Sequence, residues 1–233
     1  DLARPLADRL RGSAPRQNAA GWLRRWNHRF DVDQVGATLW AVIWPRFVQA
    51  VGQAVLDPFT AQLNAGNAGR LARALLLGEQ PPFFRADVGD LAGAACDDGM
   101  AYLRRVLGGS ARGWRWERVQ RMVLRHPVSS REDSWLDPPA VPCAGGVGVV
   151  NNRSARETVR GLEVTGGPSY RFVADLSGTE AHGCLLAGQS GQPGHRHYAD
   201  HLELWTRGRT HPLLMDEPSI AAARVATTVL RTA

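Results

Sequence analysis

The segment Thr165–Leu214 reads TGGPSYRFVADLSGTEAHGCLLAGQSGQPGHRHYADHLELWTRGRTHPLL, and it holds the clearest indications of the fold. It opens with a Gly-Gly-Pro turn at 166–168, which ends the element before it. Side chains in Ser169–Leu176 then alternate between the two sides of the chain, as they do in a β-strand. The apolar run Gly183–Ala187 indicates a second strand, which the glycine-rich residues 188–194 end.

A short helix and a further strand complete this segment. Tyr198, Leu202 and Trp205 are spaced by four and three residues, which places them on one face of a helix. Gly208 stands where that helix would end, because glycine readily takes the left-handed backbone conformation common after helices. The run His211–Met215 then predicts another strand.

The N-terminal half has the apolar spacing of helices. Its strongest feature is an unbroken row at intervals of four residues with two tryptophans beside it, namely Val35, Leu39, Ile43, Phe47, Val51 and Val55 with Trp40 and Trp44. Such a row predicts a buried helix face, and Pro45 within it predicts a kink or a restart of the helix. Further helices are expected at Leu2–Leu10, Gln17–Phe30 and Asn67–Leu77, and from an N-cap at Asp90 to Gly108.

After Gly109 the apolar period changes to that of strands. Further strand candidates are Val119–Arg125, Gly146–Val150, Glu157–Val164 and Val225–Leu230. We therefore predict an α+β fold, with residues 1–109 mainly helical and residues 110–233 mainly strands, mostly antiparallel. No long polar linker separates the halves, so we interpret residues 1–233 as a single portion of one domain.

The charge and composition of the chain exclude some classes of partner. The 233 residues carry a formal net charge of +6, which is compatible with nucleic-acid binding. The arginines are interleaved with acidic residues, however, and the Trp-containing basic segment Arg112–Arg125 also alternates like a strand. We interpret the charge as a solvated surface and expect no nucleic-acid partner. No run approaches the roughly 18 apolar residues of a membrane-spanning helix, so no membrane partner is expected.

Three cysteines, Cys96, Cys143 and Cys184, leave at least one without a disulfide partner. None belongs to a Cys-x-x-Cys motif, so a zinc site is not expected. One disulfide, for example through Cys143, stays open for an exported protein. The sequence does not decide the pairing.

Histidines and a serine near residue 195 allow two catalytic or metal-binding hypotheses. His197 and His201 could share a helix face and bind a metal ion with help from Asp200, but Gly194 favours a turn there. Ser190, His197 and Asp200 could form a local triad. Ser190 follows a strand pattern, but the glycine spacing around it differs from Gly-x-Ser-x-Gly, and the helix that a nucleophile elbow needs begins only near Tyr198. We expect structural roles for these residues.

Two other motifs also have a structural and a catalytic interpretation. His126 precedes Pro127, which holds it extended, and such a histidine is more often structural than a base. Asn151 and Asn152 could donate to an oxyanion, although a role in a turn is favoured.

Taken in chain order, several segments resemble the C-terminal portion of the catalytic (beta) chain of penicillin amidases, a family of N-terminal-nucleophile hydrolases. They are LRRWNHRFDVDQVGATLW (23–40), WRWERVQRMVLRHPVS (114–129), VPCAGGVGVVNN (141–152), GPSYRFVADLS (167–177), GQSGQPGHRHYADHLELW (188–205) and the closing RGRTHPLLM. The resemblance covers nearly all of the chain.

The resemblance implies a part of a four-layered αββα fold and of a larger acylase catalytic domain. It implies hydrolysis of a linear amide bond by an N-terminal Ser, Thr or Cys that uses its own α-amine as the base. This chain begins with Asp1, so the nucleophile, expected to be Ser, would lie on another segment, and the chain alone should be inactive. No catalytic, cofactor-binding or metal-binding residue is therefore assigned here. An acyltransferase with the same chemistry and a non-catalytic remnant stay open.

The family also suggests partners and a location. We expect autoproteolytic processing, a heterodimer, and packing against another segment of the same precursor, since the helical half carries more apolar face than one β layer covers. A small acyl amide is the expected substrate, with a role in antibiotic metabolism. No cofactor is expected, apart from a structural calcium ion in the full assembly with ligands outside this chain. An extracellular or periplasmic location is expected, with a cytoplasmic one left open. The acyl specificity and the oligomeric state are undecided.

Overall fold

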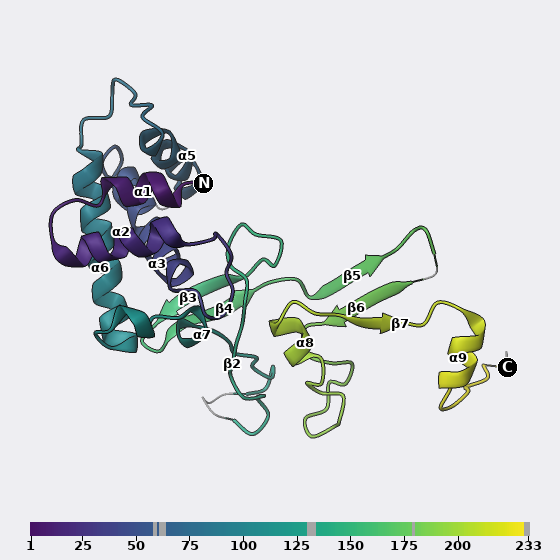
Figure 1. The fold of residues 1–233 in the computed structure, drawn as a ribbon. Coiled ribbons are helices and arrows are strands. Elements are labelled where there is room, and N and C mark those ends of the chain that lie inside the picture. The colour runs from purple at the N-terminus through teal and green to yellow at the C-terminus, as the bar shows by residue number, and fades with distance from the viewer. Residues whose placement is uncertain (58–59, 61–63, 130–133, 179, 231–233) are drawn as a thin grey trace. The chain divides into compact units, whose positions relative to one another are not determined.

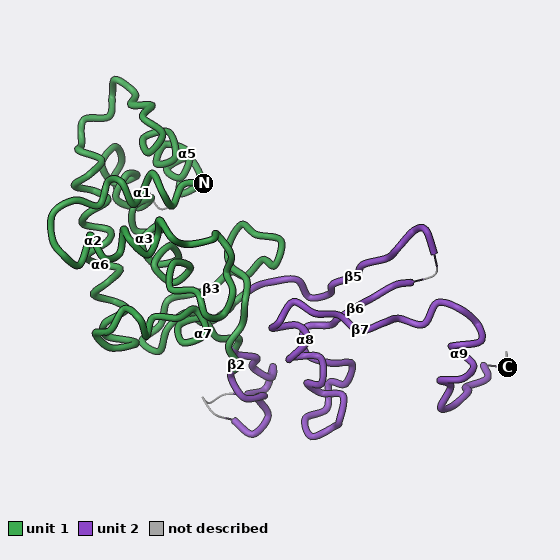
Figure 2. Tube along the Cα trace, in the orientation of Figure 1, with its two compact units in different colours: residues 1–122, 141–165 green, residues 123–140, 166–233 purple. Residues whose placement is uncertain are grey.

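The computed structural model of the chain describes all residues except 58–59, 61–63, 130–133, 179 and 231–233. The chain forms two compact units, each built from two separate stretches (Figure 2). Unit 1 comprises residues 1–122 and 141–165, and unit 2 comprises residues 123–140 and 166–233.

Unit 1 is built mainly from helices (Figure 1). They are α1 (Ala3–Arg9), α2 (Ala14–Arg25), α3 (Val35–Gln53), α5 (Ala65–Leu76) and α6 (Val88–Leu107), followed by the 3-10 turn η1 (Ala111–Gly113) and the short α7 (Trp116–Val119). Helix α3 packs against α6, α5 and α2. The buried faces of these helices form one continuous apolar core, with α3 at its centre.

Helix α3 buries the apolar row that the sequence predicts. The positions from Val35 to Val51 lie in the core, whereas Val55 lies beyond the end of the helix and is exposed. Pro45 lies inside α3, which continues past it as one helix, so the predicted restart is wrong. Other parts of unit 1 cover this row, and the expected packing against another segment stays a prediction.

Two predicted helix ends differ in the structure. Helix α2 stops at Arg25, and the buried rings of Trp26 and Phe30 follow it in a loop. The N-cap of helix α6 is Asp87, three residues before the predicted Asp90, and the Asp87 side chain accepts a hydrogen bond from the Asp90 amide (2.8 Å). Its predicted end at Gly108 is confirmed, and that glycine has a positive φ of 87°.

The sheet of unit 1 has the strand order β2-β1-β4-β3. Its strands are β1 (Gln120–Met122), β2 (Val141–Pro142), β3 (Ser154–Thr158) and β4 (Gly161–Gly166). Strand β1 runs antiparallel to β2 and parallel to β4.

Two strand predictions in this region are wrong. Residues 157–164 are not one strand, because the chain turns between β3 and β4, where Thr158 Oγ1 accepts a hydrogen bond from the Arg160 amide (3.1 Å) and donates one to the Gly161 carbonyl (2.9 Å). Residues 146–150 form a loop with a single bridge between Gly146 and Asn152.

We expect that replacing Gly161 by Ala destabilises unit 1 by roughly 2–4 kcal/mol. Gly161 has a φ of 124°, and a Cβ there would lie 2.5 Å from the Val119 carbonyl oxygen. Urea denaturation of the variant measures the loss. Gly69→Ala is the matched control, since Gly69 lies inside α5 with open space around it and alanine favours a helix by up to about 1 kcal/mol. Equal stability of the two variants would contradict the prediction.

Unit 2 contains a three-stranded antiparallel sheet with β6 in the middle. Its elements are β5 (Tyr170–Ala174), β6 (Ala181–Leu185), α8 (Leu202–Thr206), β7 (His211–Leu213) and α9 (Glu217–Ala223). The predicted strands at 169–176, 183–187 and 211–215 are confirmed in shorter or shifted form. The short helix is also confirmed, and Gly208 after it has a positive φ of 69°.

The C-terminal strand prediction is wrong. Residues 225–230 have no regular structure and are exposed. Helix α9, which the sequence analysis did not expect, precedes them. Its N-cap Asp216 accepts a hydrogen bond from the Ser219 amide (2.9 Å), and Pro218 lies in its first turn. This pairing of Asp and Pro is a recognisable start signal for a helix.

The α+β fold class is confirmed. The long helices precede residue 108, and two separate sheets with mostly antiparallel pairing follow residue 119. Short helices, α7, α8 and α9, interrupt the second half. The interpretation of residues 1–233 as a single portion of one larger domain stays a prediction.

Candidate functional site

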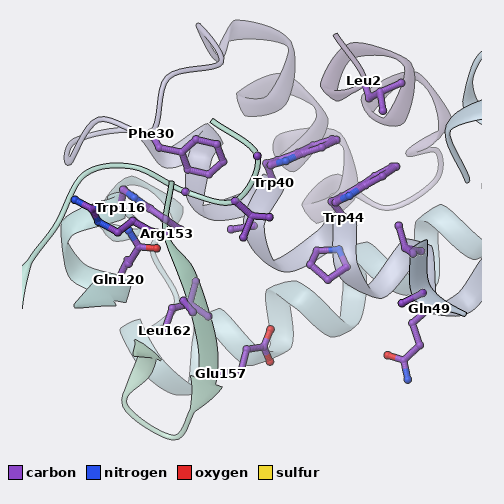
Figure 3. A pocket seen from close by; sticks show the side chains of 18 of the residues that line it. Leu2, Phe30, Trp40, Trp44, Gln49, Trp116, Gln120, Arg153, Glu157 and Leu162 are labelled. Carbon is purple, nitrogen blue, oxygen red and sulfur yellow. The ribbon is translucent and has the colours of Figure 1, made fainter. Parts of the chain in front are cut away.

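A pocket of about 1060 Å³ lies in unit 1 (Figure 3). One wall comes from α3, where Trp40 and Trp44 lie one helical turn apart with their rings stacked, 5.0 Å between centroids and 10° between planes. Phe30, Trp116 and Leu162 also line it. The pocket therefore has a wall of aromatic and aliphatic side chains, unlike the tightly packed core beside it.

Two buried polar side chains, Gln120 and Arg153, also line the pocket. The Gln120 amide donates hydrogen bonds to the carbonyl oxygens of Cys143 (3.0 Å) and Gly145 (2.9 Å). Arg153 Nη1 donates to the carbonyl oxygen of Asn152 (2.9 Å). Burial raises the pKa of the Cys143 thiol, and the nearby charge and hydrogen bond of Arg153 lower it only in part. These bonds hold the polar part of the pocket in place.

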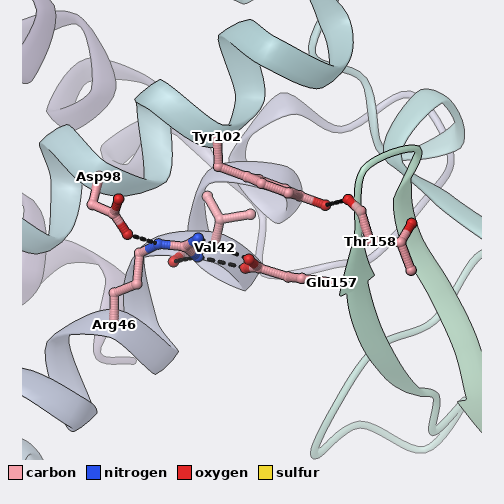
Figure 4. A network of polar contacts seen from close by, with 6 residues as sticks. All are labelled: Val42, Arg46, Asp98, Tyr102, Glu157 and Thr158. Carbon is pink, nitrogen blue, oxygen red and sulfur yellow. Dashed lines mark hydrogen bonds and ion pairs between the residues drawn. The ribbon is translucent and has the colours of Figure 1, made fainter.

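An ion-pair network joins three elements at the edge of the pocket (Figure 4). Arg46 on α3 binds both carboxylate oxygens of Glu157 on β3, with its Nη2 2.8 Å from Oε2, and its Nε donates to Asp98 on α6. Tyr102 on α6 donates to the Thr158 carbonyl (3.2 Å). The bond with Glu157 is the largest cause of a raised Arg46 pKa, so this guanidinium stays charged. Burial raises the pKa of Tyr102 to about 12, with a further contribution from the Glu157 charge.

In unit 2 the residues of the hypothetical triad are only partly connected. His197 Nδ1 lies 2.7 Å from Asp200 Oδ2, which is the pairing of a base with its orienting carboxylate. Burial raises the pKa of Asp200, but the hydrogen bond and charge of His197 and the charge of His201 lower it more, so the net pKa is lowered. Ser190 Oγ instead accepts a hydrogen bond from the Gln192 amide (3.2 Å). Among the described residues no hydrogen bond joins Ser190 Oγ to a histidine.

The other polar groups of this region make structural contacts. His201 Nδ1 accepts a hydrogen bond from the Leu185 amide (3.3 Å), and its ring packs on His211 with 4.6 Å between centroids. The Tyr198 hydroxyl donates to the Leu136 carbonyl (2.7 Å). Within the described ranges, no three or more His, Cys, Asp and Glu side chains are grouped as metal ligands would be.

His126 and the asparagine pair lie in turns. The His126 amide donates to Asp137 Oδ1 (2.8 Å), and its Nδ1 accepts from the Val128 amide (3.3 Å). Asn152 Oδ1 accepts from the Gly148 amide (3.4 Å), and the Asn151 carbonyl accepts from the Gly146 amide (3.2 Å). These bonds stabilise loops.

All three cysteines are free and buried, so the disulfide that the sequence left open is not present. Burial raises the pKa of Cys96 to about 12, which keeps this thiol protonated and unreactive at neutral pH. Of the helices in the described parts of the chain, none is long and apolar enough to cross a lipid bilayer.

Comparison with known proteins assigns the family. The family model described as penicillin amidase matches residues 1–222. The chain belongs to this family.

An acyl-homoserine lactone acylase, QuiP, from Pseudomonas syringae pv. tomato is 28% identical over 107 residues, which cover 45% of this chain and 13% of that protein. A thermostable penicillin G acylase from Alcaligenes faecalis is a structural neighbour with a TM-score of 0.47 and 15% identity, over 99% of this chain and 45% of that one. The chain thus spans less than half the length of either relative.

The sequence analysis did not predict that these residues form a pocket. Trp40 and Trp44 were placed beside a buried row, and Gln120 fell within the segment 114–129 that carries the resemblance without a role of its own. Arg46, Arg153 and Glu157 carried no motif. One signal was available: Arg46 is the one charged residue in the helix Val35–Gln53. A charged residue at such a position often has a specific partner.

Proposed function

We propose that this chain is part of an enzyme that hydrolyses a linear amide bond of an N-acyl compound. A serine outside residues 1–233 attacks the amide carbonyl, its own α-amine takes the proton, and water then releases the acid from the acyl-enzyme. The observation that carries the proposal is the penicillin amidase match over residues 1–222. The acylase named among the relatives supports an N-acyl substrate.

The contacts of the local serine support a nucleophile elsewhere. Ser190 Oγ binds a backbone amide in its own loop, and His197 pairs with Asp200 near the surface. A catalytic serine needs hydrogen-bond reach to its base. We therefore assign to this chain the role of scaffold for the reactive centre.

We also propose that another segment of the same precursor covers strand β5. This strand lies at the edge of its sheet, and Tyr170 and Phe172 on one face are 49% and 52% exposed, with their rings 6.2 Å apart. Val173 on the opposite face is also exposed. An apolar edge strand of this kind is a surface for strand pairing. Autoproteolytic processing into a heterodimer, an extracellular or periplasmic location, a structural calcium ion and a role in antibiotic metabolism belong to the proposal through the family alone.

Hydrolysis of a panel of N-acyl anilides by the full-length protein tests this function. We expect turnover, and we expect a serine-directed sulfonyl fluoride to label a residue outside 1–233. Ser190→Ala and His197→Gln should keep the rate within about tenfold, because loss of a general base typically costs about 10²–10⁴. Chain 1–233 alone should be inactive.

The same assay separates the alternatives. Transfer of the acyl group to an added amine in place of water would indicate an acyltransferase. Absence of turnover and of labelling in the full-length protein would indicate a non-catalytic remnant. Labelling of Ser190, with loss of activity in Ser190→Ala, would show that the local triad is catalytic.

A further inference from the structure

We propose that the pocket of unit 1 binds an uncharged aromatic molecule that carries a hydrogen-bond acceptor. The site lies between α3, the loop at 146–148 and the sheet of unit 1. The proposal concerns binding at this pocket and does not depend on where amide hydrolysis takes place.

The size of the pocket suits a ligand. Protein interiors are packed so closely that voids larger than a water molecule are rare. A volume of about 1060 Å³ is therefore much larger than a packing defect. It is of the size of small-molecule sites, roughly 300–1,000 Å³.

The aromatic wall favours a flat ring. Trp40 and Trp44 stack nearly in parallel and together present one extended aromatic surface. Phe30 and Trp116 lie edge to face at 5.3 Å and line the same pocket. Aromatic rings gain energy from stacked and edge-to-face contacts beyond the burial of their area, so these walls favour an aromatic ligand over an aliphatic one.

Two indole N–H groups on this wall are available as donors. The buried tryptophans each donate the indole N–H to a backbone carbonyl, namely Trp26 to Arg29, Trp114 to Gly108, Trp116 to Gly145 and Trp205 to Pro168. The half-buried Trp40 and Trp44 make no such bond to any described residue. A ligand with a carbonyl oxygen satisfies such a donor.

The charges around the pocket favour a neutral ligand. Arg46 binds both oxygens of Glu157, so this carboxylate is already compensated and attracts a cation only weakly. The guanidinium of Arg153, fully buried in the lining, also opposes a cation. An ion of either sign would lose its water against the apolar wall, and the paired charges of Arg46 and Glu157 offer little net attraction in return.

Calorimetric titration of the full-length protein with three matched probes tests the proposal. The probes share one ring system and differ in charge: 1-naphthylacetamide, 1-naphthylacetate and 1-naphthylmethylammonium. We expect the neutral amide to bind at least tenfold more tightly than either ion. Absence of binding by the amide, as expected if another segment fills the pocket, would overturn the proposal, and so would tighter binding of either ion.

Variants at the wall locate the site. Trp44→Ala should weaken binding of the amide about tenfold through loss of the stacking surface. Trp44→Phe keeps a ring but loses the indole donor, so we expect its affinity for the amide to fall about two- to tenfold. This variant tests the proposal if Trp44→Ala does not fold. Trp135→Ala is the control, because Trp135 is 83% exposed and lies in unit 2. Equal affinities of the Trp44 and Trp135 variants would overturn the proposal.

Discussion

Replacing Trp205 by Ala is expected to destabilise unit 2 by about 3–5 kcal/mol. The Trp205 side chain is fully buried, and its indole N–H donates to the Pro168 carbonyl (2.7 Å). The guanidinium of Arg171 lies 5.0 Å from the ring centroid, and its Nη1 donates to the Trp205 carbonyl (2.8 Å). Truncation removes the indole hydrogen bond and the contact of the ring with Arg171, and it leaves a void beside the sheet.

Hydrogen exchange of the full-length protein measures this effect. We expect peptides from β5 and β6 to lose protection by about two orders of magnitude or more, since each 1.4 kcal/mol is a factor of ten. Trp135→Ala removes a side chain of the same type that is 83% exposed, so it should leave the protection unchanged. Similar exchange in the two variants would show that Trp205 does not hold the sheet together.

Phe47→Ala is expected to have an effect of similar size, about 3–5 kcal/mol, in unit 1. Phe47 is fully buried on α3, at the centre of the core, and its ring lies 6.2 Å from that of Trp44. The close packing of α3 against α6 and α5 limits how far the neighbours can move to fill the space.

The midpoint of urea unfolding, followed by tryptophan fluorescence, measures the loss in Phe47→Ala. Phe83→Ala is the matched control, because Phe83 lies in the loop before α6 and is 64% exposed. A midpoint of Phe47→Ala as close to the wild type as that of Phe83→Ala would contradict the central role of α3.

The helical half was predictable because its signal is local and periodic. The row from Val35 to Val51 repeats every four residues, and burial follows that repeat directly. The predicted N-cap Asp90 was wrong, because Asp87 is the same residue type one turn earlier and the backbone geometry selects it. Pro45 was over-weighted, since packing along a helix of 19 residues outweighs the loss of one backbone hydrogen bond.

The strands were harder to place because several have weak apolar alternation. Strand β3 reads Ser-Ala-Arg-Glu-Thr and has no apolar face, so the hairpin with β4 was taken for one strand. Residues 225–230 have an apolar pattern, yet their side chains contact no core in the described structure. Composition alone does not separate an exposed apolar run from a buried one.

The candidate pocket could not be predicted from the sequence, because its residues are far apart along the chain. Arg46 and Glu157 are separated by 111 residues, and no motif links them. Trp40 and Trp44 looked like part of the core because they lie next to the buried row. They line a pocket together with residues of β3 and β4, and this arrangement is a property of the tertiary fold.

The division of the chain into two interleaved units affects the order in which its parts can fold during synthesis. Strand β1 ends at Met122, but its partners β2 and β4 lie in the second stretch of unit 1, which ends at Thr165. During synthesis residues 123–165 must still be added before this sheet can close, which takes roughly 2–9 s at about 5–20 residues per second. Strand β1 therefore has neither of its pairing partners until well after the helices of unit 1 have been made. A synonymous change that slows translation within 123–165 would delay closure of this sheet without altering the amino-acid sequence.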